Sequence, residues 1–316
     1  YVSNTSGRSY DAAAGSDGHE ILVINGGTFK GGIDGKIEIF SSRYTVRING
    51  GTFNSVGSEK TRCVIRLRNA SKGGKLYITG GTFTQTYYKS DRRAIINAAG
   101  STVYISGGTF TSDYCAIGMT DYDCLSDVYV SGGTFIGGTL DEDEKLIPGF
   151  ADFMDSNGRG KLEITGGRFP RSVLRYMPVG YTTFTDAKGF VCVKPVTTGI
   201  RSASISLGSS ILVQYHVDLA PEDFGAVMCF NMAGKTLTVT GVQSDREWIF
   251  TFPLVTPQCM TDTITAVLQK NGAALDTVPD FTVRGYCDQL LAKTVADGYT
   301  GKQLTAMKRL VVDLLT

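Results

Sequence analysis

Hydrophobic and polar residues alternate in six short segments of this chain, and each segment ends in the same kind of turn. The first and third positions of every segment are aliphatic, and a variable residue stands between them. The aliphatic pairs are Leu22 and Ile24, Val46 and Ile48, Leu76 and Ile78, Val103 and Ile105, Val128 and Val130, and Leu162 and Ile164. Alternation with a period of two is typical of a strand with one buried face, so the sequence predicts six such strands.

The turn after each strand has a repeated sequence. Gly-Gly-Thr-Phe follows at residues 26–29, 50–53, 80–83, 107–110 and 132–135, and Gly-Gly-Arg-Phe follows at 166–169. The first glycines are 24, 30, 27, 25 and 34 residues apart, a period typical of a solenoid. Further short apolar segments at 36–40, 63–68, 94–98 and 116–119 predict a second strand in each repeat. These features together predict the coils of a parallel β-helix, with loops of variable length at 54–62, 84–93, 111–127 and 136–161.

Alternation beyond the glycine pair places the two following residues on opposite faces. We expect the phenylalanines to point inward and the threonines to point outward, each as a column along the coils. The inward column is Phe29, Phe53, Phe83, Phe110 and Phe135, and the outward column is Thr28, Thr52, Thr82, Thr109 and Thr134.

The pattern changes twice after the last repeat. Alternation through 173–193 predicts a closing coil over 170–195, and 196–201 resembles a linker. Short strands are then expected at 204–207, 211–219, 227–231, 235–242, 248–254, 263–269 and 281–283, which is typical of a β-sandwich. Apolar residues at helical spacing follow on both sides of Thr300 and Gly301. We therefore expect an all-β fold with a small helical tail: a right-handed, single-stranded parallel β-helix over 1–195, an immunoglobulin-like (Ig-like) sandwich over 200–283, and a helical hairpin over 284–316.

Composition agrees with a turn-rich β protein. The 316 residues include 39 glycines and 8 prolines, and the net charge is +1, which gives no reason to expect nucleic-acid binding. The sequence contains no run of 18 apolar residues, so it predicts no membrane span. The seven cysteines are scattered without paired metal spacing. Cys63 fits a core position, and a pairing of Cys115 with Cys124 stays open as an alternative.

The later segments resemble a known family. Residues 173–181, which follow the last glycine turn at 164–169, have the pattern V-x-x-Y-x-x-x-G-Y. Together the two segments resemble a module of GGTF-repeat β-helix surface proteins of gut Clostridia (Firmicutes). The segments 260–266 and 281–286 resemble the Ig-like sandwich and helices that follow in that family. The resemblance implies secretion, cell-wall attachment at the bacterial surface and a binding role, and it carries no catalytic residues. In that family the last helix runs on into a further motif, so we expect the chain to be a fragment of a longer protein.

Acidic residues are the main candidates for chemistry. β-Helices include enzymes that cleave polysaccharides with two facing carboxyl groups. Asp121, Asp123 and Asp127 fall in one predicted loop and 141–144 in the next, so we interpret them chiefly as solvated loop residues. A calcium site at 141–144 and an active site remain as alternatives. His19 and His216 have no partner motif nearby. We expect neither a metal nor a cofactor.

The variable position between the aliphatic pairs gives the candidate binding site. Its residues are Val23, Arg47, Tyr77, Tyr104, Tyr129 and Glu163, which form one outward column if the coils stack. The tyrosines at this position in three consecutive coils suggest one of two roles. They either stabilise the sheet by stacking, or form an exposed aromatic strip that binds a sugar or a protein. Arg66 and Arg68 are expected on a neighbouring face, chiefly as solvated side chains, with binding of acidic glycans as the alternative.

The sequence therefore favours a non-enzymatic extracellular adhesion fragment, expected to be monomeric. Its expected partner is a host glycan or host protein, such as mucin or immunoglobulin. The expected ligand-binding residues are Arg47, Arg66, Arg68, Tyr77, Tyr104 and Tyr129. Two alternatives remain: a polysaccharide lyase or glycoside hydrolase on the β-helix, and a purely structural stalk of a larger cell-wall protein.

Overall fold

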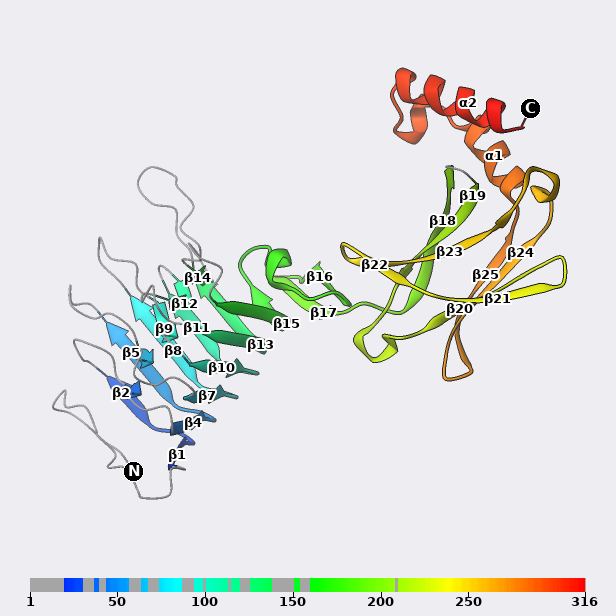
Figure 1. The fold of residues 1–316 in the computed structure, drawn as a ribbon. Helices are drawn as coiled ribbons and strands as arrows, with labels where there is room; N and C mark the ends of the chain where they lie inside the picture. The colour runs from blue at the N-terminus through cyan, green and yellow to red at the C-terminus, as the bar shows by residue number, and fades with distance from the viewer. Residues whose placement is uncertain are drawn as a thin grey trace. The chain divides into compact units, whose positions relative to one another are not determined.

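The computed structural model describes two compact units, residues Tyr1–Lys194 and Pro195–Thr316. Within them, the described residues are 20–30, 37–39, 44–56, 64–67, 74–86, 94–98, 101–112, 115–119, 126–137, 151–153, 160–207 and 210–315. Strands dominate both units, and two α-helices follow them at the C-terminal end (Figure 1).

The first unit consists of coils of parallel strands. Nine strands form one curled parallel sheet, in which the long strand β13 connects two columns. One column contains β1 (Glu20–Ile24), β4 (Tyr44–Ile48), β7 (Lys75–Ile78), β10 (Thr102–Ile105) and β13 (Asp127–Gly137), and β15 (Lys161–Phe169) adds to β13. The other contains β2 (Thr28–Lys30), β5 (Thr52–Val56), β8 (Thr82–Thr86) and β11 (Thr109–Ser112). A separate parallel sheet contains β3 (Ile37–Ile39), β6 (Ile65–Leu67), β9 (Ala94–Ala98), β12 (Cys115–Met119) and β14 (Ala151–Phe153). The expected β-helix-like architecture is therefore confirmed at this level.

The glycine pair after β10, Gly107 and Gly108, is required for two separate steric reasons. A Cβ atom on Gly107 would lie 2.2 Å from the carbonyl oxygen of Thr79 in the preceding coil. Gly108 has a φ of 98°, in the region that residues with a side chain rarely adopt. Across the turn, the N–H of Thr109 donates to the carbonyl oxygen of Gly81 at 2.8 Å. The turn thus keeps adjacent coils in the same register.

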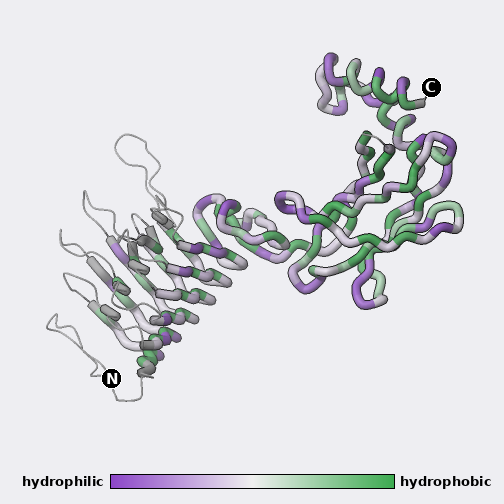
Figure 2. The backbone as a smooth tube through the Cα atoms, in the orientation of Figure 1, coloured by the Kyte–Doolittle hydropathy of each residue, from purple (hydrophilic) through white to green (hydrophobic). Residues whose placement is uncertain are grey.

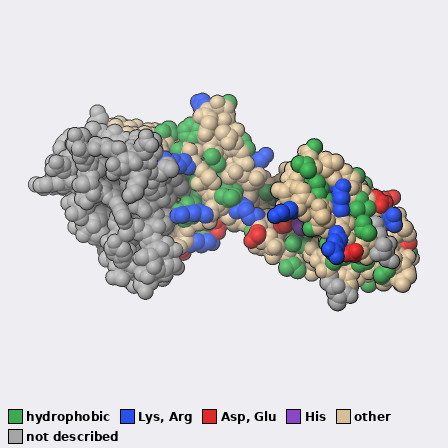
Figure 3. Space-filling view, turned by 90° about the horizontal axis from the view of Figure 1, so that it is seen from above, with side chains coloured by type: hydrophobic (Ala, Val, Ile, Leu, Met, Phe, Trp, Pro, Cys, Tyr) green, Lys and Arg blue, Asp and Glu red, His purple; other side chains and the backbone are tan. Residues whose placement is uncertain are grey.

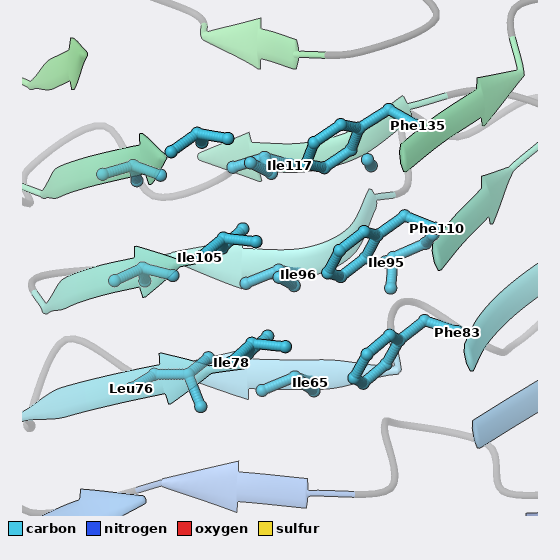
Figure 4. Packing of buried hydrophobic residues seen from close by; sticks show 14 of the residues in the cluster. Ile65, Leu76, Ile78, Phe83, Ile95, Ile96, Ile105, Phe110, Ile117 and Phe135 are labelled. Carbon is cyan, nitrogen blue, oxygen red and sulfur yellow. The ribbon is translucent and has the colours of Figure 1, made fainter. Parts of the chain in front are cut away.

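The phenylalanine column lies in the core, as predicted. Consecutive rings from Phe29 to Phe169 stack with centroids 4.6–5.1 Å apart and interplanar angles of 1–9°. Figure 4 shows Phe83, Phe110 and Phe135 beside the isoleucines of the same core. The threonines of the turn pair with one another in register and are exposed or half-buried, so the outward column is also confirmed.

The parallel stack ends at an antiparallel strand. After the 3-10 helix η2 (Leu174–Tyr176), strands β16 (Tyr181–Thr185) and β17 (Val191–Pro195) pair with each other, and β17 runs antiparallel to β15. Val173, Met177 and Val193 are buried in the same core as the coils. The segment after the last repeat therefore covers the core of the last coil.

The second unit contains two four-stranded antiparallel sheets around one core. The first sheet has the order β18 (Gly199–Leu207), β19 (Ile211–Asp218), β23 (Glu247–Val255) and β22 (Val242–Ser244). The second has the order β21 (Lys235–Thr240), β20 (Val227–Met232), β24 (Ile264–Lys270) and β25 (Ala273–Phe281). The hydropathy colours of Figure 2 change along these strands, and every second residue of β19 is buried. Phe230 of the second sheet packs against Tyr215 and Phe252 of the first, with ring centroids 5.3 and 5.1 Å apart.

Short helices complete the second unit. The 3-10 helices η3 (Pro221–Asp223) and η4 (Pro257–Cys259) connect strands, and the helices α1 (Val283–Ala292) and α2 (Gly301–Leu315) flank η5 (Val295–Asp297). Val283, Cys287 and Val311 of these helices are buried in the same core as the two sheets. No helix in the described part of the chain has the length and apolar character needed to span a membrane.

Two expected boundaries are wrong. Strand β18 begins at Gly199, within the segment 196–201 that was expected to be a linker. The expected strand at 281–283 is instead the end of β25 and the start of α1. The helix begins there because the side chain of Thr282 accepts a hydrogen bond from the N–H of Gly285 at 3.0 Å, as an N-cap does.

Candidate functional site

The outward column of the first unit brings three tyrosines together. The strand register pairs Arg47 with Tyr77, Tyr77 with Tyr104, and Tyr104 with Tyr129. The rings of Tyr77, Tyr104 and Tyr129 stack with centroids 4.8 and 5.3 Å apart and interplanar angles of 10° and 13°. We refer to these three residues as the tyrosine ladder. Each of its side chains is half-buried.

The faces of the ladder rings are already covered. Tyr104 lies between the other two rings, and the guanidinium carbon of Arg47 lies 4.4 Å from the Tyr77 centroid. At the other end, Lys161 Nζ lies 5.0 Å from the Tyr129 centroid. The ladder therefore presents ring edges and hydroxyl groups to solvent. This geometry differs from the flat aromatic surface that the sequence suggested, because residues in register on parallel strands stack face to face.

The surroundings of Tyr104 favour its protonated form. Burial raises the pKa of Tyr104, and the neighbouring Tyr77, Tyr129 and Asp127 raise it further. Its hydroxyl group is thus a hydrogen-bond donor at neutral pH. Lys161 forms an ion pair with Glu163 at 2.7 Å, and the hydrogen bond from this pair raises the pKa of the lysine. Positive charge therefore persists beside the last ring of the ladder.

A second polar column begins two residues further along the same strands. The side-chain nitrogen of Asn49 donates to Asn25 Oδ1 at 2.8 Å, and Thr79 Oγ1 donates to Asn49 Oδ1 at 2.9 Å. Asn25, Asn49 and Thr79 directly follow the last residues of β1, β4 and β7. The hydrogen-bonded part of this column coincides with the ladder only in the coil that contains Tyr77 and Thr79.

Only some of the expected ligand-binding residues lie beside the tyrosine ladder. Arg47 contacts Tyr77, but Arg66 lies in strand β6 of the separate five-stranded sheet, and nothing is described of its side chain. Several other candidates lie outside the described residues: Arg68, Asp121, Asp123, residues 141–144, His19, Cys63 and Cys124. The backbone of Cys115 is in β12, and its side chain is not described. Among the described residues, no group of three or more His, Cys, Asp or Glu side chains is arranged to hold a metal ion.

A second cluster of polar side chains lies in the second unit. His216 Nε2 lies 2.8 Å from the hydroxyl oxygen of Ser204, and His216 Nδ1 lies 3.0 Å from Glu247 Oε1. Arg201 pairs with the other oxygen of Glu247 and with Asp218. The sequence shows no partner motif near His216, and its partners are distant in sequence. The sequence gave no local signal because Ser204 and Glu247 are 12 and 31 residues from His216 and meet it only across paired strands.

Charge on the visible surface is mixed. On the face seen in Figure 3, Lys and Arg side chains are interspersed with hydrophobic and uncharged ones. The chain matches no protein-family model, no curated protein and no solved structure. The geometry of the side chains is therefore the basis for assigning a function.

Proposed function

We propose that the first unit is a right-handed parallel β-helix that binds a host glycan or an exposed segment of a host protein through the tyrosine ladder. The first unit then acts outside the cell as a non-enzymatic adhesion module at the bacterial surface, as the resemblance to GGTF-repeat surface proteins implies. In this proposal the second unit is an Ig-like sandwich, which agrees with its two antiparallel sheets around one core.

The preorganised row of three phenol groups carries the proposal. The rings are held by the sheet, by each other and by Arg47, so little conformational entropy remains to be lost on binding. Ring edges carry partial positive charge, and the hydroxyl groups donate hydrogen bonds. A ligand with acceptor oxygens at intervals close to the coil spacing matches this row. Sugar hydroxyl and carboxylate groups, or backbone carbonyls, provide such oxygens.

A matched pair of triple variants tests the proposal after a glycan and host-protein array has supplied a ligand. Replacing Tyr77, Tyr104 and Tyr129 by Phe keeps the stacked rings and removes only the hydroxyl groups. Three lost hydrogen bonds at about 0.5–1.5 kcal/mol each predict a rise in Kd of about tenfold or more with little change in Tm. Replacing the same residues by Ser is expected to abolish binding and to lower Tm.

The two variants also distinguish binding from a structural role. Unchanged affinity in the triple Ser variant, together with a lower Tm, would show that the ladder only stabilises the coils. In that case the stalk alternative would account for the first unit. The substitution Thr82→Val, on the outward threonine column, serves as a control because it removes a hydroxyl group outside the ladder.

A further inference from the structure

The cluster around His216 is on the outer face of the first sheet of the second unit. In β19, Tyr215 and Val217 are fully buried, and His216 points to the opposite face between them. The side chains of His216 and Glu247 are 23% and 26% exposed, so solvent and small molecules reach them. The cluster belongs to a different unit from the tyrosine ladder.

The hydrogen bonds give each member of the cluster a distinct role. Glu247 Oε1 faces His216 Nδ1 at 3.0 Å, and Arg201 binds Glu247 Oε2. An ionised, anchored carboxylate favours the histidine tautomer with the proton on Nδ1. The lone pair of Nε2 then points at the hydroxyl group of Ser204, 2.8 Å away. This arrangement has the nucleophile, base and positioning residue required for serine catalysis.

We propose that Ser204, His216 and Glu247 form a serine acyl-transfer site for small acyl esters, such as acetyl esters. Ser204 Oγ forms a bond to the acyl carbon while His216 Nε2 takes the hydroxyl proton. The ester C–O bond breaks, and the alcohol leaves with that proton. Water then attacks the acyl-serine, gives a proton to His216 and releases the carboxylic acid, and Ser204 recovers its hydrogen. Glu247 positions the imidazole and stabilises its charged form.

Strand β18 also offers donors for the oxyanion. In the described part of the chain, β18 pairs with β19 on one side and is the edge strand of its sheet. Every second N–H of an edge strand points away from the sheet without a ladder partner. Such N–H groups are the kind of donor that stabilises the charge developing on a carbonyl oxygen during acyl transfer. The cluster lies on the outer face of a sheet, so we expect the acyl group of the substrate to be small.

A fluorophosphonate probe tests the site directly. Its phosphorus bonds to an activated serine oxygen with loss of fluoride, and intact-mass and peptide mass spectrometry locate the adduct. We expect one adduct per chain, at Ser204, and none in Ser204→Ala. His216→Gln is expected to slow labelling about 100-fold or more, because the general base is lost. Glu247→Gln is expected to slow it less.

Ser202→Ala is the matched control. Ser202 is in the same strand and is more exposed than Ser204, so non-specific labelling would favour it. It pairs with His216 in the strand register, whereas the hydroxyl group that contacts the imidazole belongs to Ser204. Absence of an adduct at Ser204, an adduct at Ser202 instead, or equal labelling rates in wild type and His216→Gln would overturn the proposal. Circular dichroism of each variant confirms that the sheets are intact.

Discussion

At the scale of single residues, the two glycines of each turn are needed for different reasons. The second glycine of each pair has a positive φ, and the first, from the second coil on, lies against a carbonyl oxygen of the preceding coil. The first glycine of the first pair, Gly26, is different because a Cβ atom there would have no neighbour within 4 Å. The same sequence position thus has a steric requirement in one coil and none in another.

This difference predicts the outcome of two alanine substitutions. Gly107→Ala places a Cβ atom 2.2 Å from the carbonyl oxygen of Thr79, and backbone cannot move aside as a flexible side chain can. We expect a loss of about 1–3 kcal/mol or more in the free energy of unfolding. Gly26→Ala should leave that free energy within about 0.5 kcal/mol of wild type. Urea unfolding followed by circular dichroism measures both, and equal losses would contradict the steric explanation.

The phenylalanine column gives a second prediction at this scale. Phe83 is fully buried between Phe53 and Phe110, with both centroids 4.8 Å away. Phe83→Ala leaves a cavity and is expected to lower the free energy of unfolding by about 3–5 kcal/mol. Thr82→Ala, at the exposed neighbouring position, is the control and should cost little. Similar costs for both substitutions, measured by urea unfolding, would show that the assignment of faces is wrong.

At the scale of elements, the strand that ends the parallel stack is held by an ion pair. Arg168 of β15 donates to Asp186 Oδ2, with Nε at 2.9 Å. Asp186 Oδ1 also accepts the N–H groups of Lys188 and Phe190 in the turn before β17. Arginine occupies the turn position that is threonine in the other five repeats. The exception in the repeat therefore marks the coil at which the parallel stack ends.

The pH dependence of stability tests this ion pair. Burial alone would raise the pKa of Asp186, but the N–H groups and Arg168 together lower it below the ordinary value of 3.8. The carboxylate therefore stabilises the folded state above that value, and the contribution is lost as the pH falls through the lower, folded-state pKa. Asp186→Asn should lower Tm at pH 7, with a difference from wild type that shrinks in acid. A difference independent of pH between 7 and 2 would contradict this role.

The elements differ in how well the sequence predicted them. Strands with aliphatic alternation and a glycine turn, such as β7 and β10, were predicted because their burial pattern is local. Strand β14 (Ala151–Phe153) was placed in a loop, since three residues carry no measurable period. Strand β25 was also missed, because Ala273–Phe281 includes acidic residues and a proline and has few buried positions. Its place is fixed by pairing with β24, a contact that no local pattern records.

In the candidate sites, too, contacts set by the repeat were predicted from the sequence, and contacts between distant residues were not. The repeat period placed Tyr77, Tyr104 and Tyr129 in one column, and the register confirms that they are neighbours. That the ring faces are covered was not predictable, because it depends on where Arg47 and Lys161 extend their side chains. The Ser204–His216 contact was missed because it joins different strands.

At the scale of the whole molecule, the two units have separate cores. The buried residues of the coils form one cluster, and those of the two sheets and the helices form another, with no residue in common. Units with separate cores unfold as separate cooperative transitions when their interface contributes little. We therefore expect this chain to unfold in two independent transitions, one for each unit.

Calorimetry of paired variants tests this independence. Phe83→Ala is expected to lower the temperature of one transition, and Phe230→Ala, at a fully buried position of the second core, that of the other. Each substitution should move its own transition by several degrees and leave the other unchanged. A single transition that both substitutions shift equally would show that the chain unfolds as one unit.

The uniform register of the coils from β1 to β13 has a consequence for how such a molecule changes in evolution. Each coil presents its successor with the same row of backbone groups, so a tandem duplication of one repeat inserts a coil without disturbing its neighbours. Duplicating the 27 residues 80–106 would add one ring to the phenylalanine column, from Phe83, and one to the tyrosine ladder, from Tyr104. Recombination between repeats thus changes the length of the molecule and its number of binding groups together, in steps of one coil.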